Sequence, residues 1–67
     1  MLKMFTVRDA KSETYGKPFF EISNGVALRN FMTAMEDDQT MVAKYPEDFT
    51  LWYLGEYHEG TGELKPQ

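Results

Sequence analysis

The side chains most able to do chemistry in this chain gather near its C-terminus. His58 is the single histidine, and Glu56, Glu59 and Glu63 surround it in the sequence. An imidazole beside carboxylates can bind a divalent metal, but catalytic zinc sites use about three protein ligands in fixed geometry, usually with more histidine. Because these residues fall at a predicted hairpin loop, we expect solvated charges there and no metal ion.

The rest of the catalytic inventory is poor. The chain has no cysteine, which excludes disulfides and thiolate metal sites. Neither Ser12 nor Ser23 has the sequence context of a nucleophile elbow, and Ser23 is better explained as a helix cap. The segment 60–62 lacks the strand and helix that flank a phosphate-binding loop. We therefore predict no catalytic residue and no cofactor, in a protein that binds a partner and is not an enzyme.

A group of basic and aromatic residues in the first half fits one kind of binding. Cations that follow a phosphate backbone, with aromatic rings that stack on bases, are the mechanism of single-strand recognition. The alternative is that these charges only solvate the surface. The candidate nucleic-acid-binding residues are Lys3, Arg8, Lys11, Tyr15, Lys17, Phe19 and Arg29.

A second group fits a protein interface. The aromatic residues Trp52, Tyr53 and Tyr57 follow one another in a single apolar segment. One strand cannot bury both of its faces in so small a chain, and exposed aromatic side chains are enriched at protein interfaces. The alternative is that all three pack in the core.

The charge is unevenly distributed along the chain. The formal net charge is −4, whereas nucleic-acid-binding proteins usually have a basic surplus. Residues 1–35 hold five basic against three acidic side chains, and residues 36–67 hold two basic against eight acidic ones. Such asymmetry can give one face a local sign that the net charge conceals. Only the first half is therefore equipped to contact nucleic acid.

The first half of the chain reads as two strands and a helix. Alternation predicts a strand over residues 3–8 and a short one over residues 19–22, with Thr6 and Arg8 on the face opposite Phe5 and Val7. The polar connection between the strands has room for a turn of helix over residues 10–15. A helix then opens at Ser23 or Asn24 and ends near residues 36–38. Its apolar residues fall within an arc of roughly 160°: Ala27, Leu28, Phe31, Met32, Ala34 and Met35.

The second half adds a short helix and a hairpin. We expect Asp38 to cap a helix over residues 39–44, and residues 49–57 to form the strongest strand. Gly55 within this strand indicates a bulge or a close approach of another backbone segment. A loop then leads to a short return strand that begins at Leu64. The prediction is an α+β fold: a small antiparallel sheet of three to four strands, in β-β-α-β-β order, with one amphipathic helix packed on it.

This fold would occupy residues 1–67 as one domain. Domains of about 60 residues are marginally stable alone, and self-association is one way to stabilise them. No segment approaches the roughly 20 apolar residues of a membrane span, so we expect no membrane partner.

Several short segments, taken together, are similar to a known family. The chain resembles the small non-structural protein of gokushovirus-type microviruses, which are single-stranded DNA phages. The likeness runs from about residue 3 to residue 65 and rests on Pro18-Phe19-Phe20, Ala27-x-Arg29-x-Phe31, Pro46-Glu47-Asp48-Phe49-Thr50-Leu51 and Leu54-Gly55-Glu56. It implies a protein made in the cytoplasm of the infected bacterium, with a role in genome replication or packaging and no catalytic residues. Arg29 matches the family's helix arginine.

Two hypotheses follow. The first is a non-enzymatic phage accessory protein that binds viral single-stranded DNA. The second is a protein-interaction module, or a homodimer, that engages a viral replication or assembly protein or a host protein without contacting DNA.

Overall fold

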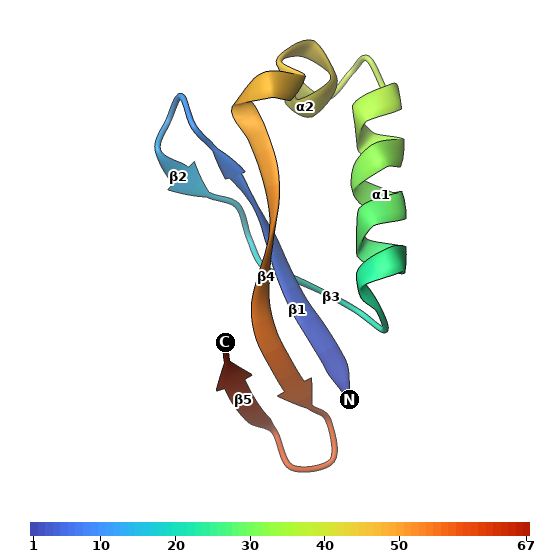
Figure 1. The fold of residues 1–67 in the computed structure, drawn as a ribbon, viewed down its shortest axis with the longest axis vertical. Coiled ribbons are helices and arrows are strands. Elements are labelled where there is room, and N and C mark those ends of the chain that lie inside the picture. The colour runs from blue at the N-terminus through green and yellow to red at the C-terminus, as the bar shows by residue number, and fades with distance from the viewer.

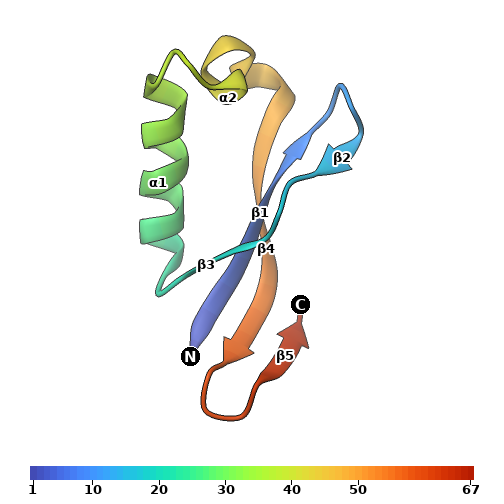
Figure 2. The same cartoon turned by 180° about the vertical axis from the view of Figure 1, so that it is seen from behind.

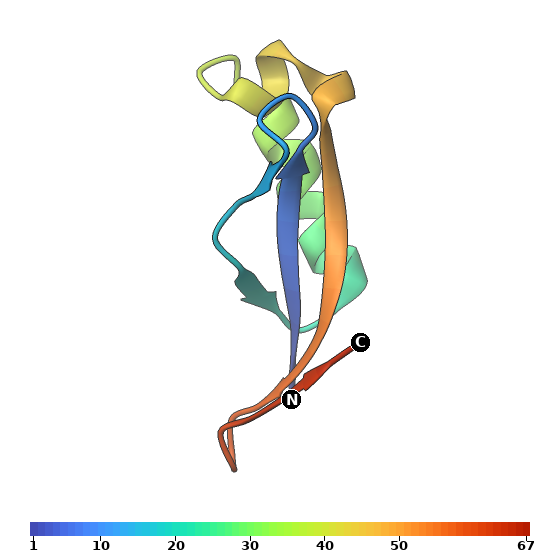
Figure 3. The ribbon, with the colours of Figure 1, turned by 90° about the vertical axis from the view of Figure 1, so that its left-hand side faces the viewer.

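Two long antiparallel strands form the centre of the protein. The structure is a computed structural model that describes residues 1–67. Strands β1 (Leu2–Asp9) and β4 (Phe49–His58) pair along their whole length and lie side by side in Figure 3. Both are rich in the aromatic and β-branched residues that fit a pleated, half-buried surface.

Three shorter strands complete a single antiparallel sheet. Strands β2 (Thr14–Tyr15) and β3 (Phe19–Glu21) both pair with the outer edge of β1, and β5 (Glu63–Pro66) pairs with β4. The α+β prediction is confirmed, with one strand more than expected. The turn of helix expected over residues 10–15 is wrong, because this segment turns back to pair with β1.

Gly55 allows β4 to change register against β1. The pairing shifts between Met4 and Phe5, which leaves Leu54 as the extra residue of a bulge. Gly55 has a φ of 140°, and a Cβ atom there would overlap the carbonyl oxygen of Lys65 on β5. The predicted bulge is confirmed, and only glycine fits it without strain.

One helix covers one face of the sheet. Helix α1 (Asn24–Glu36) stands to one side of the strands in Figure 1 and behind them in Figure 3. The predicted cap is confirmed, because the Ser23 hydroxyl accepts a 3.2 Å hydrogen bond from the amide of Val26. The Asn30 amide also donates to the Glu21 carboxylate at 2.6 Å, which ties α1 to β3.

Only half of the predicted apolar arc of α1 packs against the sheet. Ala27 is fully buried, and Phe31 and Ala34 are half-buried. The other half of the arc is exposed, because the narrow sheet covers only one side of the helix. The exposed residues are Leu28, Met32 and Met35, at 50%, 53% and 37% exposure.

A short helix and a 3-10 turn connect α1 to β4. Helix α2 (Met41–Lys44) is capped by Thr40, whose hydroxyl accepts from the amide of Ala43 at 3.1 Å. The expected cap, Asp38, lies too early. Thr40 also donates to the carbonyl of Ala34 at 2.7 Å, and so holds α2 against the end of α1. The 3-10 turn η1 (Pro46–Asp48) then leads into β4, as Figure 2 shows from behind. No helix in the protein has the length and apolar character needed to cross a membrane.

Candidate functional site

The sheet has one face that no helix covers. Phe5 lies on the face of β1 toward α1, and Thr6 and Arg8 lie on the opposite face. The sequence predicted this separation but not which face the helix covers. Figure 3 looks onto this uncovered side, with α1 behind the strands. We call it the open face. By register it also holds Leu2, Met4, Tyr15, Phe20, Thr50, Trp52, Tyr57 and Leu64.

Three strands bring a cation and two aromatic rings together on the open face. Tyr15 of β2 and Trp52 of β4 meet edge to face, with ring centroids 5.9 Å apart. The guanidinium of Arg8, on β1 between them, lies 5.6 Å from the centre of the Tyr15 ring, within the range of a cation–π interaction. The indole nitrogen of Trp52 donates to the Thr50 hydroxyl at 2.8 Å, which fixes the ring. Tyr15 and Trp52 remain 53% and 45% exposed.

A second aromatic pair lies further along the same face. The rings of Phe20 and Tyr57 are 5.5 Å apart, and Phe20 is 42% exposed. Leu64, which pairs with Tyr57 from β5, is also exposed. Trp52 pairs with Thr6, and Tyr57 pairs with Leu2. Because Thr6 and Leu2 are four residues apart on β1, the two ring pairs lie about 13 Å apart along this strand.

A buried hydroxyl holds β2 in position beneath these rings. The Thr6 hydroxyl donates to the carbonyl of Gly16 at 2.8 Å, and the Gly16 amide donates to the carbonyl of Val7 at 2.9 Å. Thr6 is almost completely buried. The two bonds anchor the chain immediately after Tyr15, so the ring is held against β1.

The charges of the strands are divided between the two faces. Lys3 lies opposite Glu21 and Glu56 on the face toward α1. Apart from Arg8, the other charged strand residues share that face by register, as does the titratable His58: Asp9, Glu63 and Lys65. Among the strand residues of the open face, Arg8 alone is charged. An acidic protein thus presents a face whose strands hold one cation and no carboxylate.

The structure separates the residues predicted to bind nucleic acid. Arg8 and Tyr15 lie together on the open face, whereas Lys3 and Phe19 lie on the face toward α1. The Lys3 ammonium is 5.8 Å from the centre of the Tyr53 ring. Phe19 is half-buried and stacks on Phe5, with centroids 5.9 Å apart and planes at 28°.

The three other predicted cations lie elsewhere. Lys11 lines a shallow pocket of about 320 Å³ at the α2 end, together with acidic and apolar side chains. Lys17 is exposed in the connection between β2 and β3. Arg29 is exposed on α1, away from the open face.

The residues predicted to form a protein interface are also divided. Trp52 and Tyr57 lie on the open face, whereas the Tyr53 ring packs on Phe5 at 5.6 Å. Sequence reasoning missed Phe20 and Leu64 as members of this surface. Period-two alternation places Phe20 opposite Phe19, but it does not say which face the helix covers.

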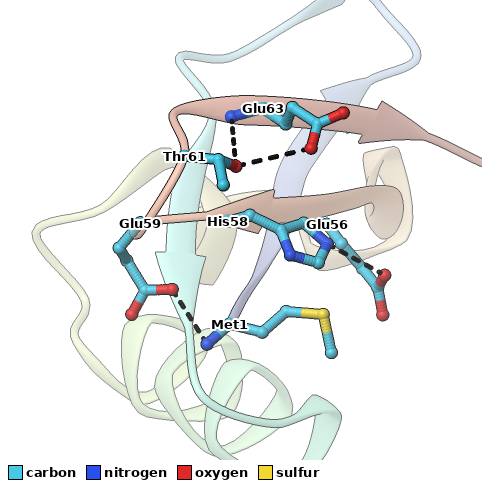
Figure 4. Close-up of polar contacts among 6 residues, drawn as sticks. All are labelled: Met1, Glu56, His58, Glu59, Thr61 and Glu63. Atoms are coloured by element: carbon cyan, nitrogen blue, oxygen red, sulfur yellow. Dashed lines mark hydrogen bonds and ion pairs between the residues drawn. The ribbon is translucent and has the colours of Figure 1, made fainter.

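The polar residues around the last hairpin contact different partners (Figure 4). Glu59 accepts a 2.8 Å hydrogen bond from the N-terminal amine of Met1, which is the main reason that the pKa of this carboxyl falls below its usual value. The Nε2 atom of His58 lies 3.9 Å from the Glu56 carboxylate. Glu63 pairs with Thr61 instead. No three histidine or carboxylate side chains come close enough together to hold a metal ion.

Comparison with known families identifies the kind of protein. A model of the Phage ORF5 protein family matches residues 2–67. The chain belongs to this family. The match confirms a small phage protein; a microvirus origin stays a prediction. No curated protein and no solved structure is significantly similar to the chain.

Proposed function

We propose that this Phage ORF5 family member binds single-stranded DNA across its open face, in support of viral genome replication or packaging. The observation that supports the proposal is the cluster of Arg8, Tyr15 and Trp52. It places two half-exposed rings and one guanidinium from three strands on a rigid sheet. Stacking of unpaired bases on such rings, with a cation beside them, is the way in which sheet-based domains bind single strands.

The second ring pair extends the binding surface. Phe20 and Tyr57 lie about 13 Å from the first pair along β1, so separate bases of one strand can stack at the two places. Each stacked base contributes roughly 1–3 kcal/mol, with little dependence on sequence. Duplex DNA offers no unstacked bases, so the open face should prefer single strands.

The charges indicate a binding mode dominated by stacking. In this proposal the phosphates meet Arg8 and Lys17, which is exposed in the connection after Tyr15, and no strand carboxylate of the open face opposes Arg8. With about two phosphate contacts, log K should fall against log salt with a slope of about −1.4. The acidic side chains elsewhere would hold the strand away from the rest of the surface.

Fluorescence anisotropy of a labelled thymidine oligonucleotide, titrated over a series of salt concentrations, tests the proposal. We expect saturable binding to the single strand, a shallow salt slope and much weaker binding to the matching duplex. Absence of binding at low salt, or equal affinity for both forms, would overturn it.

The exposed apolar side chains of Phe20 and Leu64 favour a second candidate. Leu64 offers no polar group to a nucleotide, so the same face could receive an apolar patch of a viral or host protein. In that case Phe20→Ala and Leu64→Ala would abolish capture of one defined protein partner, and no oligonucleotide would compete for the face.

A further inference from the structure

An apolar stripe along the outer side of α1 has no partner in the chain. Leu28, Met32 and Met35 follow one another at helical spacing, and each is between 37% and 53% exposed. The stripe has no hydrogen-bond donor and only weak thioether acceptors, so it offers nothing to a phosphate or a base edge. Its chemistry fits another apolar surface, and methionine adapts readily to such contacts.

The overall dimensions indicate surface that a compact monomer would bury. A compact chain of 7.8 kDa exposes about 4,400 Å², whereas this one exposes 4896 Å². Its radius of gyration is 12.8 Å, against about 11 Å for a compact chain of 67 residues. The excess area of about 500 Å² is more than half of the roughly 800 Å² that each partner contributes to a standard interface.

The charges beside the stripe are self-complementary. Arg29 and Glu36 lie two turns apart on the same flank of α1, only about 20° from each other around the helix. Neither forms an ion pair within the chain. Glu36 also lies in the last turn, where the helix dipole disfavours a negative charge and no basic residue offsets it.

We propose that two copies of this chain form a homodimer through the α1 stripe, with the two helices antiparallel about a two-fold axis near Met32. In an antiparallel pair of this symmetry the same flank of each helix meets its equivalent, so Arg29 of each copy lies beside Glu36 of the other. A parallel pair would bring opposite flanks together and leave both charges without a partner. The proposal is independent of DNA binding, because the open face lies on the far side of the sheet from α1.

Sedimentation equilibrium of the whole chain tests the dimer. We expect a species of twice 7.8 kDa at micromolar concentration. Met32→Glu should raise the dissociation constant more than about tenfold, because it would bury two unpaired carboxylates near the axis. Met41→Glu is the matched control, since Met41 is 57% exposed on α2 and lies off the stripe. Circular dichroism confirms that each variant folds.

A charge exchange tests the antiparallel arrangement and does not depend on the behaviour of Met32→Glu. Arg29→Glu or Glu36→Arg alone should weaken the dimer by about fivefold, since each places like charges together at two symmetric positions. The double variant Arg29→Glu with Glu36→Arg should restore the original affinity. A monomer at all concentrations, equal effects of Met32→Glu and Met41→Glu, no effect of the single charge variants, or a dimer that Trp52→Ala dissociates instead would overturn the proposal.

Discussion

The ring of Trp52 meets the ring of Tyr15 edge to face, with centroids 5.9 Å apart, although β4 and β2 are not neighbours in the sheet. Strand β1 lies between them and provides Arg8, whose guanidinium contacts the Tyr15 ring. The pairing of a short second strand with β1 is therefore what assembles the site. Because these contacts hold the three side chains in place, the proposed stacking of bases on them would cost little conformational freedom.

Removal of the tryptophan ring should weaken binding of single-stranded DNA. We expect Trp52→Ala to reduce the affinity for a thymidine oligonucleotide by roughly 1–3 kcal/mol, which is the contribution of one stacked base. Tyr45→Ala is the matched control, because Tyr45 is 49% exposed but lies at the α2 end. Titration calorimetry measures both. Equal losses in the two variants would show that the open face is not the binding surface.

Neutralisation of the cation on the open face should change the salt dependence. Arg8→Gln removes one phosphate contact, so the slope of log K against log salt should become shallower by about 0.7. It also removes the cation beside the Tyr15 ring. Lys44→Gln, an exposed change on α2, should leave the slope unchanged. Anisotropy titrations at several salt concentrations distinguish the two, and an unchanged slope for Arg8→Gln would exclude Arg8 from phosphate binding.

The Thr6 hydroxyl should contribute to the stability of the fold. Thr6→Val keeps the shape of the side chain but leaves the Gly16 carbonyl without its donor, at a cost of about 1–3 kcal/mol in the free energy of unfolding. Thr33→Val, which removes an exposed bond to the Arg29 carbonyl, should cost less than about 0.5 kcal/mol. Urea denaturation measures both values. If the two variants lose equal stability, the bond does not anchor β2.

The bulge of β4 should tolerate no side chain. An alanine at this position in Gly55→Ala would have to adopt a positive φ, and its Cβ atom would overlap the Lys65 carbonyl. We therefore expect the free energy of unfolding to fall by about 1–3 kcal/mol from the backbone strain, and further from the overlap. Gly60→Ala is the control, because a Cβ atom there meets nothing. Hydrogen exchange should also show faster exchange of the Gln67 amide, which bonds the Leu54 carbonyl at 2.9 Å. A Gly55→Ala protein as stable as the control would contradict the described path of β5.

The contact between Glu59 and the N-terminal amine should make stability depend on acidity. The folded state lowers the pKa of this carboxyl, mainly through the hydrogen bond from the amine. Its stabilising contribution is therefore complete above the usual pKa of a glutamate and is lost as pH falls through the lower, folded value. Thermal melting should show that Glu59→Gln is slightly less stable than the natural chain near neutral pH, and that the difference disappears in acid.

The sequence predicted the longer elements well because their patterns are strong. The strand over residues 49–57 follows from a long run of apolar and aromatic residues, and the helix after Ser23 from apolar residues that recur over several turns. The Gly55 bulge follows from a glycine within a strand. The sequence does not predict the two-residue strand β2, because the conformation of β2 comes from pairing with β1 and not from its own composition. The cap of α2 was assigned to Asp38 instead of Thr40, an error of two residues at a helix boundary.

The membership of the site could be predicted only in part. Alternation separated Arg8 from Phe5 correctly, but period two does not reveal which face a helix will cover. Phe19 and Tyr53 were therefore grouped with exposed candidates although both pack on Phe5. The contact between Tyr15 and Trp52 depends on a strand order that sequence spacing does not encode.

Intrinsic fluorescence gives the most direct test of DNA binding on the open face, because Trp52 is the only tryptophan in the chain. A base that stacks on the indole ring should quench its emission. Titration with an unlabelled thymidine oligonucleotide should therefore give saturable quenching at the same midpoint as the anisotropy titration, and Tyr15→Ala should shift both midpoints together. Oligonucleotide binding that leaves the Trp52 emission unchanged, or no binding at low salt, would contradict the proposal.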